Sequence, residues 1–348
     1  MKKNFVNNLP ILLKSLSRSE EKIGYSKKGL KALTGSSNFN PMLNFDRQEF
    51  EISRPKKQKG MSISGYQPKL QLIIHNAQFD IIDASGDYIL KPSPDNFPFL
   101  AENEHATMQV MKALKFDMPE NGLVYFNTDN PAEKNFAFVI KRYDRAENLQ
   151  IHQEQLDGAM GITEKYGKIK DDGEQYVSYE RVVKFILNNV TQANLALQKT
   201  LFLRVVYAYL LGNNDLHLRN FSLIIARNGN ISLAPVYDFV SVKPYAEVFN
   251  DSLLALPLLE KEEGGNQLAD GFETQYGCYL GMDFIEFGKN IGLSEKFCQK
   301  LLVDLPKASD KIHEIYQNSF MPLEHQQQVL QCYQHRLGYL QIFNEPKL

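Results

Sequence analysis

A short polar loop carries the side chains of this sequence that are best suited to chemistry. The segment GNNDLHLRNFSLI places Asp215, His217 and Asn220 close together, and Asp238 ends the later stretch LAPVYD. Phosphoryl transfer from ATP needs such a set, because one carboxylate accepts the proton of the attacking hydroxyl while an amide oxygen and a second carboxylate hold Mg²⁺. The alternative interpretation is that these Asn and Asp residues only form a local turn at a helix end.

Two spacings favour the chemical interpretation. Asp215 precedes Asn220 by five residues, which is the interval of the kinase catalytic loop. Upstream, YILKP places Lys91 at the end of an expected strand, ahead of a helix that contains Glu102 and Glu104. A strand lysine paired with a helix glutamate is how protein kinases hold the α- and β-phosphates of ATP. Seen alone, the lysine is more typical of an exposed side chain beside a solvated helix face.

A β-rich region followed by a helical region must position these side chains. Between residues 62 and 144, apolar runs predict several strands, and the apolar spacing over 100–116 predicts one helix. Further on, helical spacing is clearest over 178–190, with Ser178 as the expected N-cap, and over 196–214, with Gly212 and Asn213 as the expected stop. Asn228-Gly229 predicts a β-hairpin. We therefore expect an α+β, bilobal protein-kinase-like fold, with a small β-rich N-lobe that has one helix and a larger, mainly helical C-lobe.

The chain length of 348 residues is enough for two domains or for one two-lobed domain. We expect residues 1–60 to form an N-terminal extension and linker, because a Ser/Asn/Gly-rich segment and the basic run RPKKQKG replace the periodic apolar pattern found elsewhere. The kinase N-lobe is then expected over residues 61–145 and the C-lobe over residues 146–348.

Composition excludes several classes of protein. The 39 Lys and Arg residues and the 41 Asp and Glu residues leave a net charge of −2, which argues against direct nucleic-acid binding, because that affinity depends on neutralising phosphates. The three cysteines lack metal-ligand spacing and are expected to be reduced packing residues. No secretory signal is recognisable, and the apolar stretch 201–212 is too short to span a bilayer and contains Arg204. We expect a cytoplasmic protein with no membrane partner.

Seven segments, taken in order, resemble the HipA family of bacterial serine/threonine kinases, the toxins of HipBA-type toxin–antitoxin systems. They cover about residues 62–240 and read SISGYQPKL, YILKP, ENEHA, FVIKRYDR, HQEQ, GNNDLHLRNFS and LAPVYD. The combination of S-x-x-G-x-Q-x-K with D-x-H-x-x-N-F-S carries the resemblance. It implies an enzyme that uses ATP and Mg²⁺ to phosphorylate a protein serine.

The resemblance also implies a role for each matching residue. Asp215 becomes the catalytic base, and Asn220 and Asp238 become the Mg²⁺ ligands. Lys91 would meet the ATP phosphates, with Glu104 rather than Glu102 as its helix partner. The complete set implied for ATP binding comprises Ser64, Gly65, Lys69, Lys91, Glu104, Lys141, Tyr143 and His217.

Within that set, Lys141 to Tyr143 would form the hinge that meets adenine, and His217 would brace the catalytic loop. In this family a serine of the phosphate loop is autophosphorylated, so Ser62 or Ser64 would be modified. A phosphoserine would place roughly two negative charges where the ATP phosphates bind, and repulsion would expel the loop. The alternative is that these serines only make turn hydrogen bonds.

The phosphate loop begins near residue 62, so we expect the additional N-terminal subdomain of the long HipA proteins to be missing. This resembles the short HipT branch, in which a separate small protein, HipS, acts as antitoxin beside the DNA-binding HipB. The resemblance thus implies HipS-like and HipB-like partners. It implies an aminoacyl-tRNA synthetase as substrate, the tryptophanyl enzyme ahead of the glutamyl one, and growth arrest as the outcome.

Two other functions fit parts of the same sequence. One is a catalytically silent partner that uses the kinase fold as a scaffold in an operator-binding complex, against which the intact catalytic set argues. The other is a lipid or small-molecule kinase, because D-x-H-x-x-N also resembles the loop of phosphoinositide kinases. The upstream S-x-x-G-x-Q-x-K loop argues against that second alternative.

Overall fold

The computed structural model describes residues 8–15, 17, 20, 24–57, 68–128, 134–146, 149–247 and 252–344. The chain divides into two compact units. The first unit comprises residues 1–145 and 314–326, and the second comprises residues 146–313 and 327–348.

The first unit is built on a five-stranded antiparallel sheet with the strand order β2-β1-β3-β5-β4. The strands are β1 (Leu70–His75), β2 (Gln78–Ile82), β3 (Tyr88–Pro92), β4 (Asn121–Tyr125) and β5 (Phe136–Lys141). The helices that accompany them are α1 (Lys27–Thr34), α2 (Arg47–Lys57) and α3 (Leu100–Ala113). The one helix predicted for residues 61–145 is α3, whereas α1 and α2 belong to the preceding segment, for which the sequence predicted no helix.

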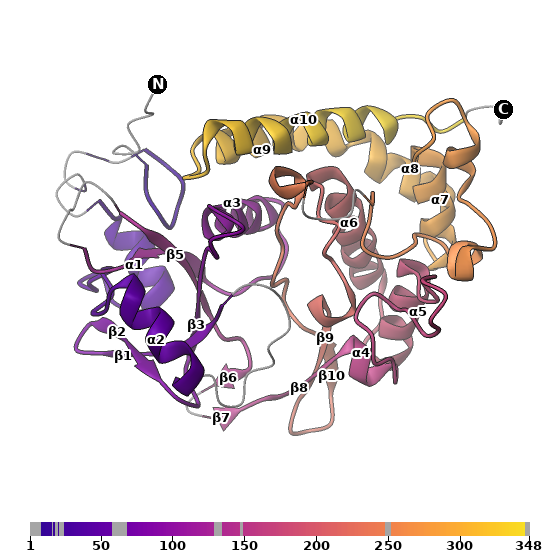
Figure 1. Cartoon of the computed structure of the whole chain (residues 1–348). Coiled ribbons are helices and arrows are strands. Elements are labelled where there is room, and N and C mark those ends of the chain that lie inside the picture. The colour runs from indigo at the N-terminus through magenta and orange to yellow at the C-terminus, as the bar shows by residue number, and fades with distance from the viewer. Residues whose placement is uncertain are drawn as a thin grey trace. The chain divides into compact units, whose positions relative to one another are not determined.

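The two faces of the sheet are covered by different helices (Figure 1). Because side chains alternate along a strand, Leu90 and Val139 share one face, where they pack in a single hydrophobic core with residues of α1 and α2. Lys91 and Phe138 share the opposite face, and α3 packs on the sheet through β3, β4 and β5. This second face therefore positions the lysine beside the helix that carries the glutamates.

Residues 8–57 contribute to this core, in contrast to the expected extension and linker. Ile11 is buried against Gly122 of β4, where an added Cβ would lie 2.8 Å from Ile11 Cγ1. The backbone N–H of Leu123 donates to Pro10 O at 2.9 Å, so the N-terminal segment follows the edge strand of the sheet. The expected extension over residues 1–60 is therefore wrong for the residues described there.

Residues 314–326 also belong to the first unit, although they come late in the chain. Thr107 Oγ1 of α3 shares a hydrogen bond of 3.0 Å with Tyr316 Oη. Phe136 of β5 packs edge-to-face on Phe320, with 4.9 Å between the ring centroids. The expected C-lobe, residues 146–348, therefore loses this stretch to the first unit.

The second unit is mainly helical. Its helices are α4 (Leu156–Ala159), α5 (Tyr179–Asn189), α6 (Leu195–Leu211), α7 (Gly281–Asn290) and α8 (Glu295–Val303). Helices α9 (Ser309–Gln317) and α10 (Leu323–Tyr339) follow, and each of them has some residues in the first unit, within 314–326. Short 3₁₀ turns lie at η2 (Leu218–Asn220), η3 (Lys243–Tyr245), η4 (Glu260–Gly265), η5 (Asp270–Glu273) and η6 (Leu305–Ala308).

The ends of α5 and α6 follow the chemistry of their capping residues. Ser178 caps α5 as predicted, since its hydroxyl accepts a hydrogen bond from Arg181 N at 3.1 Å. Helix α6 begins after Asn194 and ends at Gly212, whose φ of +68° suits glycine. The catalytic loop of the sequence analysis therefore begins directly after a helix of which ten residues, including Val205 and Leu211, are buried.

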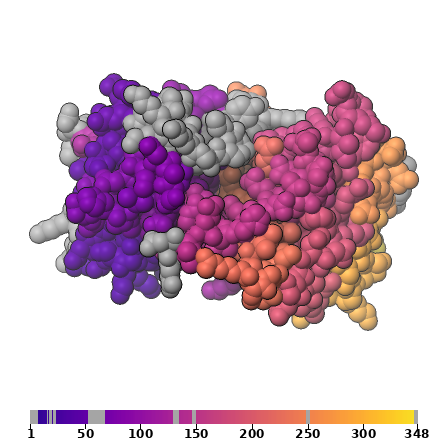
Figure 2. Space-filling model, turned by 90° about the horizontal axis from the view of Figure 1, so that it is seen from below, coloured from indigo at the N-terminus to yellow at the C-terminus, as the bar shows by residue number. Residues whose placement is uncertain are grey.

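Three short strands form the sheet of the second unit, in the order β10-β9-β8. They are β8 (His152–Gln155), β9 (Ser222–Ile225) and β10 (Ile231–Leu233). The hairpin predicted at Asn228-Gly229 is confirmed, and its tip is exposed beside β8 on the surface shown in Figure 2. A ribbon of β6 (Arg145–Ala146) and β7 (Leu149–Gln150) precedes this sheet along the chain.

Within the described part of the chain, no helix is long and apolar enough to cross a membrane.

Candidate active site

A buried ion pair marks the first unit. Lys91 Nζ of β3 donates to Glu104 Oε1 of α3 at 2.6 Å, and these two side chains are 6% and 3% exposed. The ammonium also lies 5.7 Å from the ring centroid of Phe138. Breaking such a pair by removing one partner costs about 3–5 kcal/mol, because it leaves a buried charge uncompensated. The lysine is therefore firmly oriented at the end of its strand.

The neighbouring glutamate of α3 has a different environment. Glu102 accepts a hydrogen bond of 3.3 Å from Ser93 Oγ, and burial raises its pKa to about 7. Ser93 Oγ also accepts from Ala101 N at 2.9 Å, so it caps α3 from outside the helix. The two glutamates thus differ in their partners, and Glu104 is the one that pairs with Lys91.

The end of β5 is fixed by an arginine that the sequence analysis did not single out. Arg142 donates to both carboxylate oxygens of Asp144, at 2.8 and 2.6 Å, and to Gln71 Oε1 at 3.3 Å. It lies between Lys141, which is exposed, and Tyr143, which is half-buried. An arginine–aspartate pair two residues apart at a strand end was the signal in the sequence.

The phosphate loop of the sequence analysis is largely outside the described residues. Ser62, Ser64 and Gly65 fall there, so their predicted roles stay predictions. Lys69 is described, and it lies half-buried immediately before β1.

In the second unit, the predicted catalytic loop is closed on itself by hydrogen bonds. Asn220 Nδ2 donates to Asp215 O at 2.7 Å, which ties the two ends of the five-residue interval together. Asn213 Oδ1 accepts from Asp215 N at 3.2 Å, and Asn220 N donates to His217 O at 2.9 Å. The loop therefore has a defined shape in which Asp215 and Asn220 are close neighbours.

A buried arginine of α6 supports the predicted catalytic loop by a hydrogen bond to its backbone. Arg204, which is 1% exposed on α6, donates from Nη2 to Asn220 O at 2.7 Å. Its guanidinium carbon also lies 4.3 Å from the ring centroid of Phe221. On the other side, Tyr179 Oη donates to Leu216 O at 2.8 Å. The sequence signal for this support was Arg204 itself, a charged residue inside the apolar stretch 201–212.

His217 lies close to one carboxylate of the predicted site, with its Nε2 3.7 Å from Asp215 Oδ1. Burial lowers the pKa of its imidazole, and the nearby charges of Asp215 and Asp238 oppose that effect only in part. The histidine is therefore neutral at neutral pH and supplies no positive charge to the site. Asp238 itself is half-buried and has a φ of +55°, in the left-handed region, at the turn that follows β10.

Two residues of the segment before α5 also reach Asp215, and the sequence analysis missed both. Tyr166 Oη donates to Asp215 Oδ1 at 2.7 Å, and Lys165 Nζ lies 4.0 Å from the same oxygen. They lie almost fifty residues before the loop, where periodicity and local motifs offer no signal. These contacts come only from the tertiary fold.

The predicted Mg²⁺ donors fit the ion by their chemistry. The amide nitrogen of Asn220 is committed to Asp215 O, so its Oδ1 is the atom that can face a cation, and Asp238 adds a carboxylate. Mg²⁺ prefers such oxygen donors and is commonly held by one or two carboxylates together with substrate phosphates. In the described residues, no group of three or more His, Cys, Asp or Glu side chains could hold a metal by itself.

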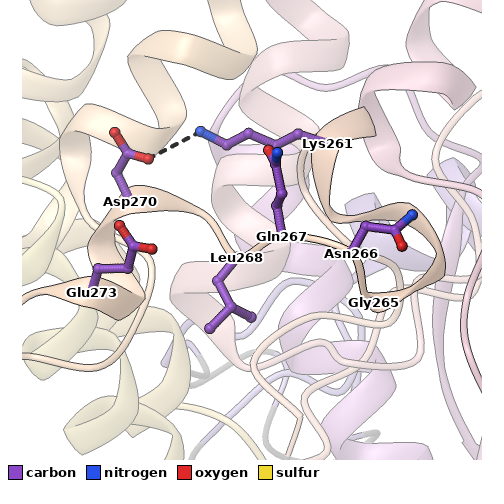
Figure 3. Close-up of a pocket in the computed structure, with 7 residues that line it drawn as sticks. All are labelled: Lys261, Gly265, Asn266, Gln267, Leu268, Asp270 and Glu273. Atoms are coloured by element: carbon purple, nitrogen blue, oxygen red, sulfur yellow. Dashed lines mark hydrogen bonds and ion pairs between the residues drawn. The ribbon is translucent and has the colours of Figure 1, made fainter.

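A separate pocket of about 530 Å³ lies elsewhere in the second unit (Figure 3). Its lining residues are Lys261, Gly265, Asn266, Gln267, Leu268, Asp270 and Glu273. Lys261 Nζ contacts Asp270 Oδ1 at 3.2 Å and Glu286 Oε2 at 2.8 Å, so its charge is already balanced. No residue of the predicted ATP or metal site lines this pocket.

A strand lysine paired with a helix glutamate in one unit, and a closed Asp–Asn loop in the other, are the features of protein-kinase-like enzymes. The profile of the family described as HipA-like C-terminal domain matches residues 61–312. The chain therefore belongs to this family.

Relatives with similar sequences are named as kinases. A Haemophilus influenzae protein, named as an inferred kinase, is 57% identical over 345 residues. These residues are 99% of this chain and 100% of that protein. The serine/threonine-protein kinase toxin HipA of Shewanella oneidensis is 26% identical over 212 residues, which are 56% of this chain and 46% of that protein.

Solved structures show the same fold. HipA of Shewanella oneidensis, solved with HipB and its operator DNA, is similar with a TM-score of 0.62 and 20% identity, over 83% of this chain and 68% of that one. The Helicobacter pylori proinflammatory kinase CtkA is similar with a TM-score of 0.51 and 17% identity, over 83% of this chain and 92% of that one. The predicted kinase-like α+β fold is thereby confirmed, while assignment to the HipT branch stays a prediction.

Proposed function

We propose that the chain is an ATP-dependent serine/threonine protein kinase and the toxin of a HipA-type toxin–antitoxin system. The observation that carries this proposal is the hydrogen bond from Asn220 Nδ2 to Asp215 O, because it ties a general base to a metal-binding amide at the kinase interval. The buried pair of Lys91 and Glu104 supports it independently, since a strand lysine held by a helix glutamate is what ATP phosphates require.

In the proposed reaction, Asp215 accepts the proton of a serine hydroxyl as the hydroxyl oxygen bonds to the γ-phosphorus of ATP. Asn220 and Asp238 would hold Mg²⁺, which neutralises charge on the phosphates when it is bound. Lys91 would bind the α- and β-phosphates in the orientation that Glu104 imposes. His217, neutral and buried, would brace the loop and transfer no proton.

Adenine would meet the hinge at Lys141 to Tyr143, which the bonds between Arg142 and Asp144 fix in shape. We include Lys69 and the loop with Ser64 and Gly65 in the nucleotide site. Ser62 or Ser64 is then the site of autophosphorylation, with loss of ATP binding as its consequence.

The proposed substrate is an aminoacyl-tRNA synthetase, the tryptophanyl enzyme ahead of the glutamyl enzyme, and the outcome in cells is growth arrest through loss of a charged tRNA pool. The proposed partners are a HipB-like DNA-binding protein and a small HipS-like antitoxin. The complex of Shewanella HipA with HipB and operator DNA supports the HipB-like partner.

The test follows transfer of ³²P from [γ-³²P]ATP with Mg²⁺ to the purified full-length chain and to both synthetases. We expect Asp215→Asn to lower the rate of transfer about a hundred- to ten-thousand-fold, the range of a general base. Asp238→Asn should abolish transfer through loss of the metal. Asp310→Asn, on an exposed residue at the start of α9, is the matched control and should leave the rate unchanged.

Equal transfer by the wild type and the Asp215→Asn variant would refute the proposal. Binding of Mg·ATP without transfer to protein would favour the silent scaffold instead. Transfer to lipid but not to protein pools would favour a lipid kinase.

A further inference from the structure

The segment that precedes α5 is held against the catalytic loop by its backbone. Leu218 N, within the loop, donates to Lys165 O at 3.0 Å. Gln175 Nε2 donates to Tyr166 O at 3.0 Å, and Tyr176 N donates to Gly167 O at 2.8 Å. The main chain at residues 165–167 is therefore bonded on both sides, and the side chains that it carries have fixed starting points.

Gly167 makes this close packing achievable. Its φ is +74°, and an added Cβ would lie 2.8 Å from Val177 Cβ, so a larger residue would strain the backbone and push Val177 away. The turn is also closed by Glu164, whose Oε2 accepts from Tyr166 N at 2.8 Å and from Lys168 N at 3.1 Å.

The phenol of Tyr166 fixes the carboxylate of Asp215. Tyr166 Oη donates to Oδ1 at 2.7 Å, and the ring packs edge-to-face on His217 with 5.3 Å between centroids. Because Oδ1 is engaged by the phenol, Oδ2 is the oxygen that can accept a proton from an acceptor hydroxyl. A base oriented in advance needs no rearrangement when the substrate arrives.

Lys165 supplies positive charge at the same place. Its ammonium lies 4.0 Å from Asp215 Oδ1 and 4.7 Å from the ring centroid of Tyr166, and the side chain is 21% exposed. His217 Nε2 is also 3.7 Å from Oδ1. Arg219, in the loop itself, is paired with Asp157 at 2.6 Å.

We propose that Lys165 and Tyr166 complete the phosphotransfer machinery of this chain, Tyr166 as a positioning residue for Asp215 and Lys165 as the cation that stabilises the transferred phosphoryl group. This inference rests on the kinase function proposed above. The acceptor oxygen bonds to the γ-phosphorus, the bond from that phosphorus to the oxygen of ADP breaks, and ADP leaves with the electron pair. The hydroxyl proton passes to Asp215, while Lys165 keeps its own protons and offsets charge on the non-bridging oxygens.

The test compares Lys165→Met, Lys165→Arg and Tyr166→Phe in the ³²P transfer assay with full-length protein. We expect Lys165→Met to lower kcat about a hundred- to a thousand-fold, as for loss of one transition-state contact, with KM for ATP within about twofold. Lys165→Arg should recover at least about a tenth of the wild-type rate, because it keeps the charge. Tyr166→Phe should lower kcat about tenfold, since it loses one hydrogen bond to a charged group but keeps the ring.

Lys168→Met is the matched control, because Lys168 is exposed in the same turn and its backbone N–H, which the substitution keeps, donates to Glu164. Its kcat should equal that of the wild type. Wild-type kcat in Lys165→Met, with Asp215→Asn inactive, would overturn the inference and leave the kinase function standing. Equal losses in Lys165→Met and Lys165→Arg, or a parallel loss of ATP affinity, would also overturn it. Transfer no faster in the wild type than in Asp215→Asn would instead overturn the kinase function.

Discussion

Individual residues in this protein take their properties from burial more than from sequence position. Glu102 and Glu104 lie two residues apart on α3, and both are buried. Glu104 pairs with Lys91, whose Nζ lies 2.6 Å from its Oε1. The carboxyl of Glu102 accepts a hydrogen bond from the Ser93 hydroxyl, and burial raises its pKa to about 7. The same residue type is therefore an ion-pair partner at Glu104 and a group that titrates near neutral pH at Glu102.

The raised pKa of Glu102 predicts a specific pH dependence of stability. The folded state keeps the proton up to about pH 7, whereas the unfolded state releases it near pH 4.5. The unfolding free energy should therefore fall as pH rises through this window, by about 3 kcal/mol from this group. Glu102→Gln mimics the neutral carboxyl and removes that loss. Urea unfolding at pH 5 and pH 8.5 should show the variant gaining about 3 kcal/mol over the wild type at the higher pH.

Glu120→Gln is the control for this measurement, because Glu120 is about one-third exposed and paired with Lys112. Its unfolding free energy should follow the pH dependence of the wild type. A constant difference between Glu102→Gln and the wild type at both pH values would contradict the prediction.

At the scale of elements, local patterns predicted what local chemistry determines. Ser178 and Gly212 cap their helices as expected, because capping depends on a side-chain oxygen and on a left-handed φ. The turn between β1 and β2 was missed. Asn76 and Ala77 both have positive φ, at +49° and +55°, and alanine there gives no turn signal. The register of β1 on β2 imposes that conformation.

The helices α1 and α2 were missed for a related reason. Helix α1 has eight residues and includes a glycine, and so short a helix is marginal in isolation. It exists because Leu30 and Leu33 are buried in the core of the sheet. Contacts between distant segments, which periodicity does not contain, also explain why Tyr166 was not recognised beside Asp215 while the Asp–Asn interval was.

The packing of α2 can be tested by removing one side chain. Phe50 is fully buried and packs edge-to-face on Phe126, with 5.8 Å between centroids. Phe50→Ala should lower the unfolding free energy by about 3–5 kcal/mol, through lost apolar burial and the cavity that remains. Ile52→Ala, on the same helix but 66% exposed, should change it by no more than about 0.5 kcal/mol.

Urea unfolding of the full-length variants measures both effects. A loss below about 1 kcal/mol in Phe50→Ala would indicate that residues 24–57 are a separable extension after all, as the composition of the segment had suggested.

At the scale of the whole molecule, each unit contains some of the residues implied for catalysis. Lys91 and Glu104 come from the first unit, whereas Asp215, Asn220 and Asp238 come from the second. Family membership rests on residues 61–312, while the core of the first unit also uses residues 8–57 and 314–326. The matched region therefore carries the proposed chemistry, and segments on either side of it contribute to the packing of that first unit.

The overall charge of the molecule leads to a prediction about DNA. The chain has 39 Lys and Arg residues against 41 Asp and Glu residues, so it lacks the excess of positive charge that releases counterions from a duplex. The relative from Shewanella was solved with both HipB and operator DNA. We expect this chain alone to bind a labelled operator duplex no more tightly than about 10⁻⁴ M at physiological salt, the weak end of non-specific binding.

Fluorescence anisotropy over a range of salt concentrations measures this affinity. A HipB-like partner, added at a fixed concentration, should confer tight binding whose logarithm falls steeply with the logarithm of salt concentration, because the partner then makes the phosphate contacts. The kinase chain should add mass to that complex and leave the slope unchanged. Micromolar binding by the chain alone, or a steeper slope when it joins the complex, would mean that its own lysines and arginines contact the phosphates despite its balanced charge.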